Sequence, residues 1–76
     1  MTKAEQILAA LGGDANVLDL EPCTTRLRSL VRDASRVDSA ALRAAGAFGV
    51  MISGRVVQVV VGPHVDLIAT DLDELM

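Results

Sequence analysis

Two apolar, β-branched segments separated by a tight-turn sequence constrain the fold of this chain most strongly. The segments are residues 48–52 and 56–61, and Ser53-Gly54-Arg55 lies between them. A short glycine-containing stretch between two such runs is typical of a β-hairpin. Because a strand must bury its apolar side chains against another layer, the rest of the chain has to supply that layer.

A second pair of strands is predicted upstream. Residues 17–20 are mostly apolar and precede Pro22, a pattern that suits a short strand stopping at a loop. Leu27, Leu30 and Val31 indicate the next strand. Side chains alternate between the two faces of a strand, so Arg26 and Arg28 should project from the same face. On a helix the same two side chains would splay apart.

Capping residues mark the starts of three expected helices, and glycines mark the ends of the first two. Thr2 and Glu5 fit a capping box at the start of the first. Asp38 is a favoured N-cap for the second, and Pro63 suits the first position of the third. The expected helices cover about residues 3–11, 38–46 and 63–75, and Gly12-Gly13 and Gly46 end the first two.

The elements follow one another in the order α-β-β-α-β-β-α. This order predicts an α+β fold, a two-layer sandwich in which helices cover one face of a four-stranded antiparallel sheet. A chain of 76 residues is expected to form a single domain spanning residues 1–76. The order of the strands within the sheet is left open.

Composition narrows the range of partners. The net charge is −3, and Phe48 is the only aromatic side chain, so neither single-stranded nucleic acid nor a general polyanion is an expected partner. The sequence shows no signal peptide and no apolar run of membrane-spanning length, which predicts a cytoplasmic protein without direct membrane insertion. A monomer with transient partners is the default expectation. Six arginines against two aspartates lie between residues 26 and 55. These arginines form either a solvated face or a local basic patch suited to a phosphate.

The sequence Pro-Cys-Thr-Thr-Arg-Leu-Arg at residues 22–28 carries the predicted chemistry. Cys23 is the only cysteine, so it cannot form an internal disulfide. Nearby positive charge favours the thiolate, which is the attacking form of cysteine, and arginine binds phosphoryl groups with two parallel N–H donors. The hydroxyls of Thr24 and Thr25 and the backbone N–H groups after Pro22 are expected to complete an anion site. The structural alternative is that Cys23 is a small buried apolar residue.

Other chemistries fit the sequence less well. A cysteine-dependent phosphatase loop needs an arginine at the sixth position after the cysteine, but that position is Ser29, and Arg28 comes one residue too early. One cysteine and one histidine cannot fill a zinc shell, so neither a metal nor another cofactor is expected. We interpret His64 as an exposed residue near a helix cap rather than a phosphate acceptor. Gln58 lies among valines, and either faces solvent or helps to bind a ligand.

The heptapeptide resembles the Cys-x-Thr-Arg-Leu-Arg signature of the IIB domains of the bacterial sugar phosphotransferase system, glucose branch. The resemblance runs from about Ala4 to the end of the chain, with further matches at residues 37–42, 46–50 and 57–63. Two positions depart from the usual pattern. Pro22 replaces a small residue, and Thr24 stands where isoleucine is frequent.

The resemblance implies a phosphocarrier, and therefore a phosphotransferase. Such a domain accepts a phosphoryl group on Cys23 from a phosphohistidine IIA protein. It passes the group to a sugar of the glucose or N-acetylglucosamine type held by a membrane IIC partner, at the inner face of the membrane. The resemblance assigns onward transfer to Arg26 and Arg28, phosphate hydrogen bonding to Thr25, and an unspecified role to Gln58. Because the chain starts with Met, ends at a complete predicted helix and carries no IIC or IIA region, we expect a free-standing IIB protein. The alternative class is a non-catalytic anion-sensing or regulatory module.

Overall fold

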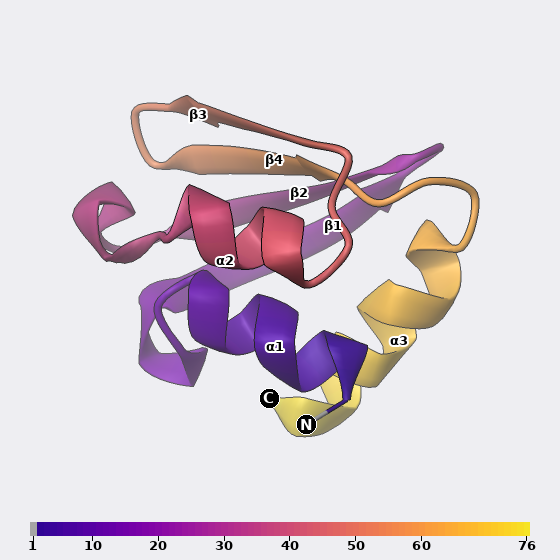
Figure 1. Cartoon of the computed structure of the whole chain (residues 1–76). Helices are drawn as coiled ribbons and strands as arrows, with labels where there is room; N and C mark the ends of the chain where they lie inside the picture. The colour runs from indigo at the N-terminus through magenta and orange to yellow at the C-terminus, as the bar shows by residue number, and fades with distance from the viewer. Residues whose placement is uncertain (1) are drawn as a thin grey trace.

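The computed structural model describes residues 2–76, in which helices cover one face of a four-stranded antiparallel sheet (Figure 1). The predicted fold class is therefore confirmed. The helices are α1 (Lys3–Ala10), α2 (Ser39–Ala44) and α3 (Val65–Leu75). The strands are β1 (Val17–Cys23), β2 (Arg26–Val31), β3 (Gly49–Ser53) and β4 (Val56–Val60). Short 3₁₀ turns at Asp14–Asn16 and Ala34–Arg36 flank the β1–β2 hairpin.

The two hairpins join through their second strands. The strand order is β1-β2-β4-β3, so β2 and β4 are central while β1 and β3 form the edges. Burial alternates along both central strands, as expected for a sheet with one covered face. Leu27 on β2 and Val57 on β4 face the helices and are fully buried, whereas Arg28 is exposed. The sheet therefore has a second, open face on which polar side chains gather.

The core lies between the helices and the covered face of the sheet. Each helix contributes large apolar side chains to it, and the central strands contribute the opposing layer. Burying one such side chain contributes about 1.5–3 kcal/mol to stability, so these contacts hold the helices against the sheet. The fully buried apolar residues include Ile7, Leu11, Leu27, Val31, Leu42, Val57, Val59 and Leu72.

The predicted helix starts are confirmed in two of three cases. Thr2 and Glu5 form the capping box, with N···O distances of 3.1 and 3.2 Å. The carboxylate of Asp38 accepts a hydrogen bond from the backbone N–H of Ala41 at 3.0 Å. The third start was predicted two residues too early. Pro63 lies in the turn before α3, and the N-cap is His64.

A buried amide that the sequence did not predict joins three elements. The Nδ2 of Asn16 donates to the carbonyl of Leu11 at 2.6 Å and to the carbonyl of Asp33 at 3.1 Å. Its Oδ1 accepts from the backbone N–H of Asp33 at 2.9 Å. Asn16 is only 1% exposed, so these bonds satisfy an amide that would otherwise be costly to bury. These hydrogen bonds connect the end of α1 with the start of β1 and the end of β2.

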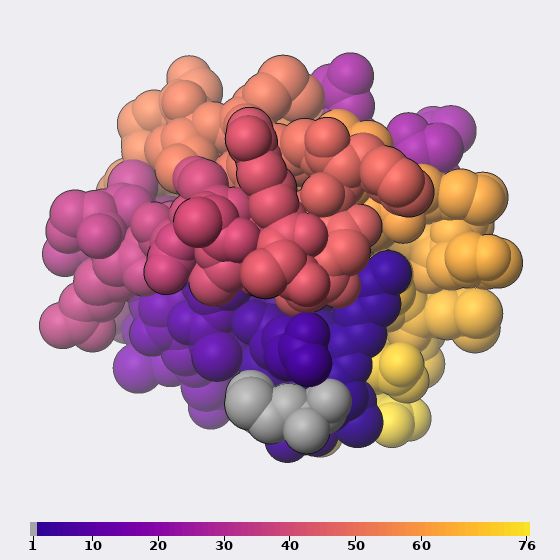
Figure 2. Space-filling view, in the orientation of Figure 1, coloured from indigo at the N-terminus to yellow at the C-terminus, as the bar shows by residue number. Residues whose placement is uncertain are grey.

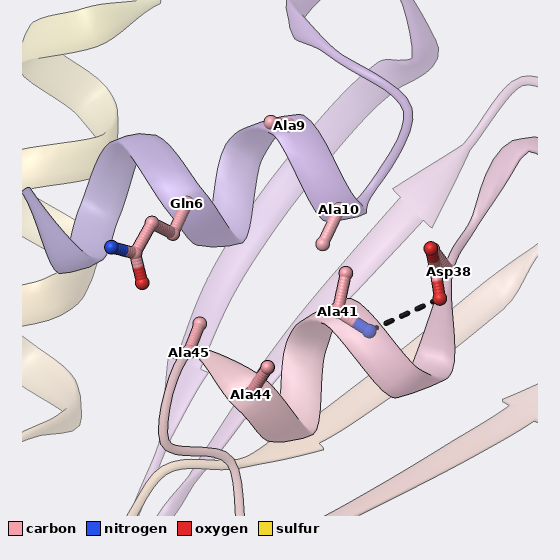
Figure 3. A pocket seen from close by; sticks show the side chains of 7 residues that line it. All are labelled: Gln6, Ala9, Ala10, Asp38, Ala41, Ala44 and Ala45. Atoms are coloured by element: carbon pink, nitrogen blue, oxygen red, sulfur yellow. Dashed lines mark hydrogen bonds between the residues drawn. The ribbon is translucent and has the colours of Figure 1, made fainter. Parts of the chain in front are cut away.

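The helical layer carries a shallow groove between α1 and α2. Figure 2 views the molecule from this side, with the tip of the β1–β2 hairpin protruding from behind the helices. The groove has a volume of about 350 Å³. Figure 3 shows Ala10 and Ala41 pointing toward one another from the two helices that form it. None of the predicted site residues lines this groove. Within residues 2–76, no helix is both long and apolar enough to span a membrane.

Candidate functional site

Cys23 is the last residue of β1 and is exposed at the tip of the first hairpin. The buried-cysteine alternative is therefore wrong. The prediction that β1 stops at Pro22 is also wrong, because the strand continues through Pro22, which pairs with Leu27 on β2. An edge strand tolerates proline, since one side of its backbone has no partner strand to bond. The expected loop is reduced to the two-residue turn Thr24-Thr25.

This turn is held in a fixed position. Two-residue hairpin turns need a positive φ at their first central position, and Thr24 adopts φ +34°. Threonine is rarely found in that conformation, so the turn requires support from its surroundings. The carbonyl of Thr25 accepts hydrogen bonds from the backbone N–H groups of Val61 and Gly62, both at 3.0 Å. The segment after β4 therefore fixes the turn that presents Cys23.

The strand register brings four predicted site residues together on the open face. Cys23 lies opposite Arg26, and Arg28 lies opposite Gln58 on the next strand. Arg26 and Arg28 are both exposed on the same side of β2, as period-two alternation predicted. The Nη1 of Arg26 donates to the Oε1 of Gln58 at 3.2 Å. Gln58 therefore faces the open side of the sheet and orients one of the two guanidinium groups.

The remaining candidates lie at the margin of this group. Thr24 and Thr25 are exposed in the turn beside Cys23. His64 is the N-cap of α3, and its side chain makes no capping hydrogen bond. It is exposed, as we predicted from the sequence. Among the described residues, no group of three or more His, Cys, Asp or Glu side chains is placed to hold a metal ion.

Sequence reasoning missed an acidic neighbour of the thiol. The Sγ of Cys23 lies 4.0 Å from the Oε1 of Glu21, toward which it can donate a weak hydrogen bond. Glu21 is also the register partner of Arg28, and both line a small hollow of about 110 Å³ on the open face. Alternation along β1 would have placed Glu21 beside Cys23 if the strand had been extended past Pro22.

The hairpin end of the molecule also exposes apolar surface. Phe48 is 80% exposed, and its backbone N–H donates to the carbonyl of Val60 at 2.8 Å. Its ring lies over Gly62, where an added Cβ would come within 3.3 Å of a ring carbon. Gly62 is hydrogen-bonded to the turn after Cys23, so this exposed aromatic side chain lies beside the segment that supports the turn.

Comparisons with known proteins agree with this arrangement. A family model described as phosphotransferase system, EIIB, matches residues 5–38, which include Cys23 and both arginines. The chain is 48% identical over 75 residues to the N-acetylglucosamine-specific EIIB component of Streptomyces coelicolor, covering 99% of this chain and 97% of that relative. The chain belongs to the EIIB family of the phosphotransferase system. It is therefore a phosphotransferase component of a sugar transport system.

Other relatives contain this EIIB region within longer proteins. The glucose-specific EIICBA component of Streptococcus pneumoniae is 37% identical over 76 residues, which are 99% of this chain but 10% of the relative. The N-acetylglucosamine-specific EIICB component of Bacillus subtilis is 46% identical over 67 residues, 87% of this chain and 15% of the relative. A solved domain of a IIabc component from Clostridium difficile superimposes with a TM-score of 0.75 at 23% identity, covering 97% of this chain and 82% of that one, and shows the shared fold.

Proposed function

We propose that this EIIB protein carries a phosphoryl group on Cys23, from a phosphohistidine of a IIA protein to a sugar bound by a membrane IIC partner. The observation that carries the proposal is the exposed Sγ of Cys23 at the tip of a hairpin, with Arg26 directly opposite it in register. A nucleophile that two different partners must reach in turn needs such an exposed position. A guanidinium beside it can bind the phosphate that arrives.

The chemistry consists of two displacements at phosphorus. The Cys23 thiolate attacks the phosphorus of the donor, an S–P bond forms, and the N–P bond breaks with its electron pair left on the imidazole nitrogen. A sugar hydroxyl oxygen then attacks the same phosphorus and loses its proton to solvent, an O–P bond forms, and the S–P bond breaks with its electron pair left on sulfur. Such transfers depend mainly on positioning and on stabilising the charge of the phosphoryl oxygens.

The neighbouring side chains have separate roles in this proposal. Arg26 and Arg28 bind the phosphoryl oxygens on Cys23, and Gln58 holds the guanidinium of Arg26 at 3.2 Å in the orientation that this requires. The hydroxyls of Thr24 and Thr25 donate further hydrogen bonds from the turn. Arg26 lies opposite Cys23 in the strand register, and Thr24 and Thr25 follow Cys23 directly in the turn.

The partners and the sugar class follow from the relatives. Several relatives are named as EIICB or EIICBA components, so in them the B region occurs in one chain with a C component, or with C and A components. We infer that this single-domain chain, acting as a monomer, meets IIA and IIC partners at the cytoplasmic face of the membrane. The relative matched over 97% of its length is named as N-acetylglucosamine-specific, which favours N-acetylglucosamine over glucose as the sugar.

Intact-protein mass spectrometry tests the first transfer. Incubation with a phosphorylated IIA donor should increase the mass of the wild-type protein by one phosphate. Cys23→Ala should show no increase, because the attacking sulfur is gone. An increase that survives this substitution contradicts the proposal. Reversible binding of phosphate without any covalent increase would instead favour the anion-sensing module.

Arginine-to-lysine variants test the second transfer. Lysine keeps the positive charge of Arg26 or Arg28 but loses the planar fork that binds two phosphoryl oxygens at once. Each variant should therefore accept phosphate from IIA, yet form sugar phosphate at least about tenfold more slowly, which corresponds to about 1.4 kcal/mol of lost transition-state binding. The measurement is sugar phosphorylation in membranes that contain the IIC partner. Wild-type rates in both variants would show that charge alone is sufficient.

A further inference from the structure

Glu21 places a negative charge beside the sulfur that the proposed function phosphorylates. Glu21 and Cys23 are two residues apart on β1, so their side chains project from the same face. The distance from the Sγ of Cys23 to the Oε1 of Glu21 is 4.0 Å, and both residues are exposed. A phosphoryl group attached to this sulfur would carry nearly two negative charges next to the carboxylate.

The open face around Glu21 holds charges of both signs. Asp19 lies two residues earlier on the same side of β1, while Arg26 and Arg28 face Cys23 and Glu21 from β2. Glu21 and Arg28 are direct register partners and line the same hollow. A carboxylate at this position would repel a phosphoryl group on Cys23.

We propose that Glu21 destabilises the phosphorylated form of Cys23 and so favours onward transfer of the phosphoryl group to the sugar. The inference rests on the proposed function and adds a residue that sets how readily the carrier gives up its phosphate. A carrier that bound its phosphoryl group too tightly would accept it readily from the donor but would transfer it slowly to the sugar. Glu21 offsets part of the attraction that Arg26 and Arg28 provide.

Coulomb's law gives the size of the effect. Two unit charges about 4 Å apart in water change an equilibrium by about fivefold. The nearly doubled charge of the phosphate increases this factor, while salt screening in an exposed site decreases it. Removal of the Glu21 charge is therefore expected to shift the phosphotransfer equilibrium about five- to tenfold toward the phosphorylated protein.

The first experiment measures this equilibrium. Phosphorylated IIA is mixed with excess EIIB protein, and the phosphorylated fractions of both are read by intact mass for the wild type and for Glu21→Gln. The matched control is Asp19→Asn, which removes the same charge from the same strand face. At about 3.3 Å per residue, Asp19 lies about 13 Å from Cys23, beyond the screening length of about 8–10 Å, so its effect should stay below about twofold.

The expected result is a five- to tenfold shift in Glu21→Gln alone, with slower sugar phosphate formation from the phosphorylated variant. An unchanged equilibrium, a shift toward the donor, or an equal shift in Asp19→Asn overturns the inference. These outcomes are distinct from failure of the proposed function. If wild-type Cys23 takes up no phosphate, the proposed function is wrong and the inference falls with it. Normal uptake with an unchanged equilibrium overturns the inference alone.

A second experiment tests the charge itself without any phosphate donor. Cys23 is alkylated with iodoacetate, which is anionic, and with iodoacetamide, which is neutral, and the two rates are divided. The quotient cancels changes in thiol ionisation and reports repulsion of an anion at the sulfur. Glu21→Gln should raise it about two- to fivefold, and Asp19→Asn should leave it unchanged. An unchanged quotient in Glu21→Gln overturns repulsion as the cause.

Discussion

Replacing Asn16 with alanine should destabilise the fold more than any single surface change. The amide is 1% exposed and makes three hydrogen bonds to the backbone, two of them to Asp33 and one to the carbonyl of Leu11. Asn16→Ala removes all three and leaves those backbone groups without their partner. The substitution also removes the hydrogen bonds that connect the end of α1 with the start of β1 and the end of β2.

The expected loss of unfolding free energy follows from how well solvent can replace each lost hydrogen bond. Leu11 is fully buried, so its carbonyl loses its bond from Asn16 away from solvent, which costs about 1–3 kcal/mol. Asp33 is exposed, so its two backbone groups can recover water, and each lost bond costs about 0.5–1.5 kcal/mol. The sum centres near 4 kcal/mol, against a total stability of about 4–11 kcal/mol for a chain of this length. A domain of this size loses about 4–8 °C in Tm for each kcal/mol, so the Tm should fall by about 16–32 °C.

Urea unfolding followed by far-ultraviolet circular dichroism measures this loss. The matched control is Asp73→Ala, an exposed change on α3 that should stay within about 0.5 kcal/mol of the wild type. A loss below about 1 kcal/mol for Asn16→Ala would refute the reasoning. Such a result would mean that water replaces the amide at all three backbone groups, and that Asn16 does not hold the hairpin to the helical layer.

Two further predictions concern the same end of the molecule. Gly12→Ala should lower the free energy of unfolding by at least about 2 kcal/mol, because φ is +105° at this position and the added Cβ would lie 2.5 Å from the Nδ2 of Asn16. An unchanged urea midpoint would contradict this prediction. Hydrogen bonds from the Ser35 side chain, and secondarily from its backbone N–H, lower the pKa of Asp33. The ionised carboxylate therefore stabilises the fold at pH values above the ordinary aspartate pKa. This contribution is lost as the pH falls through the lowered pKa. Ser35→Ala should therefore be less stable than the wild type at neutral pH but should match it near pH 2, and a difference that persists in acid would refute the assignment.

Local patterns predicted most of the site because they act over a few residues. Arg26 and Arg28 share a face since strand side chains alternate, and the sequence alone predicted that placement. The same alternation would have included Glu21, but Pro22 was interpreted as the end of the strand. Proline lacks a backbone donor, which excludes it from central strands, whereas β1 lies at the edge of the sheet. The error therefore came from not knowing which strands are edges.

The remaining features depend on contacts between distant parts of the chain. The strand order places β4 beside β2, and only that pairing brings Gln58 against Arg26 and Arg28. No local pattern in the sequence specifies this order, so Gln58 was left between two interpretations. Asn16 is similar, because its bonds to Asp33 span 17 residues and a buried asparagine resembles an exposed one in sequence.

A chase of the isolated phosphoprotein tests the central claim most directly. The EIIB protein is labelled with radioactive phosphate through the IIA donor, separated from the donor, and added to membranes that contain the IIC partner and N-acetylglucosamine. We expect the label to leave Cys23 and appear in sugar phosphate with no donor present. Label that stays on the protein, is released only as inorganic phosphate, or resides on a residue other than Cys23 would contradict the account.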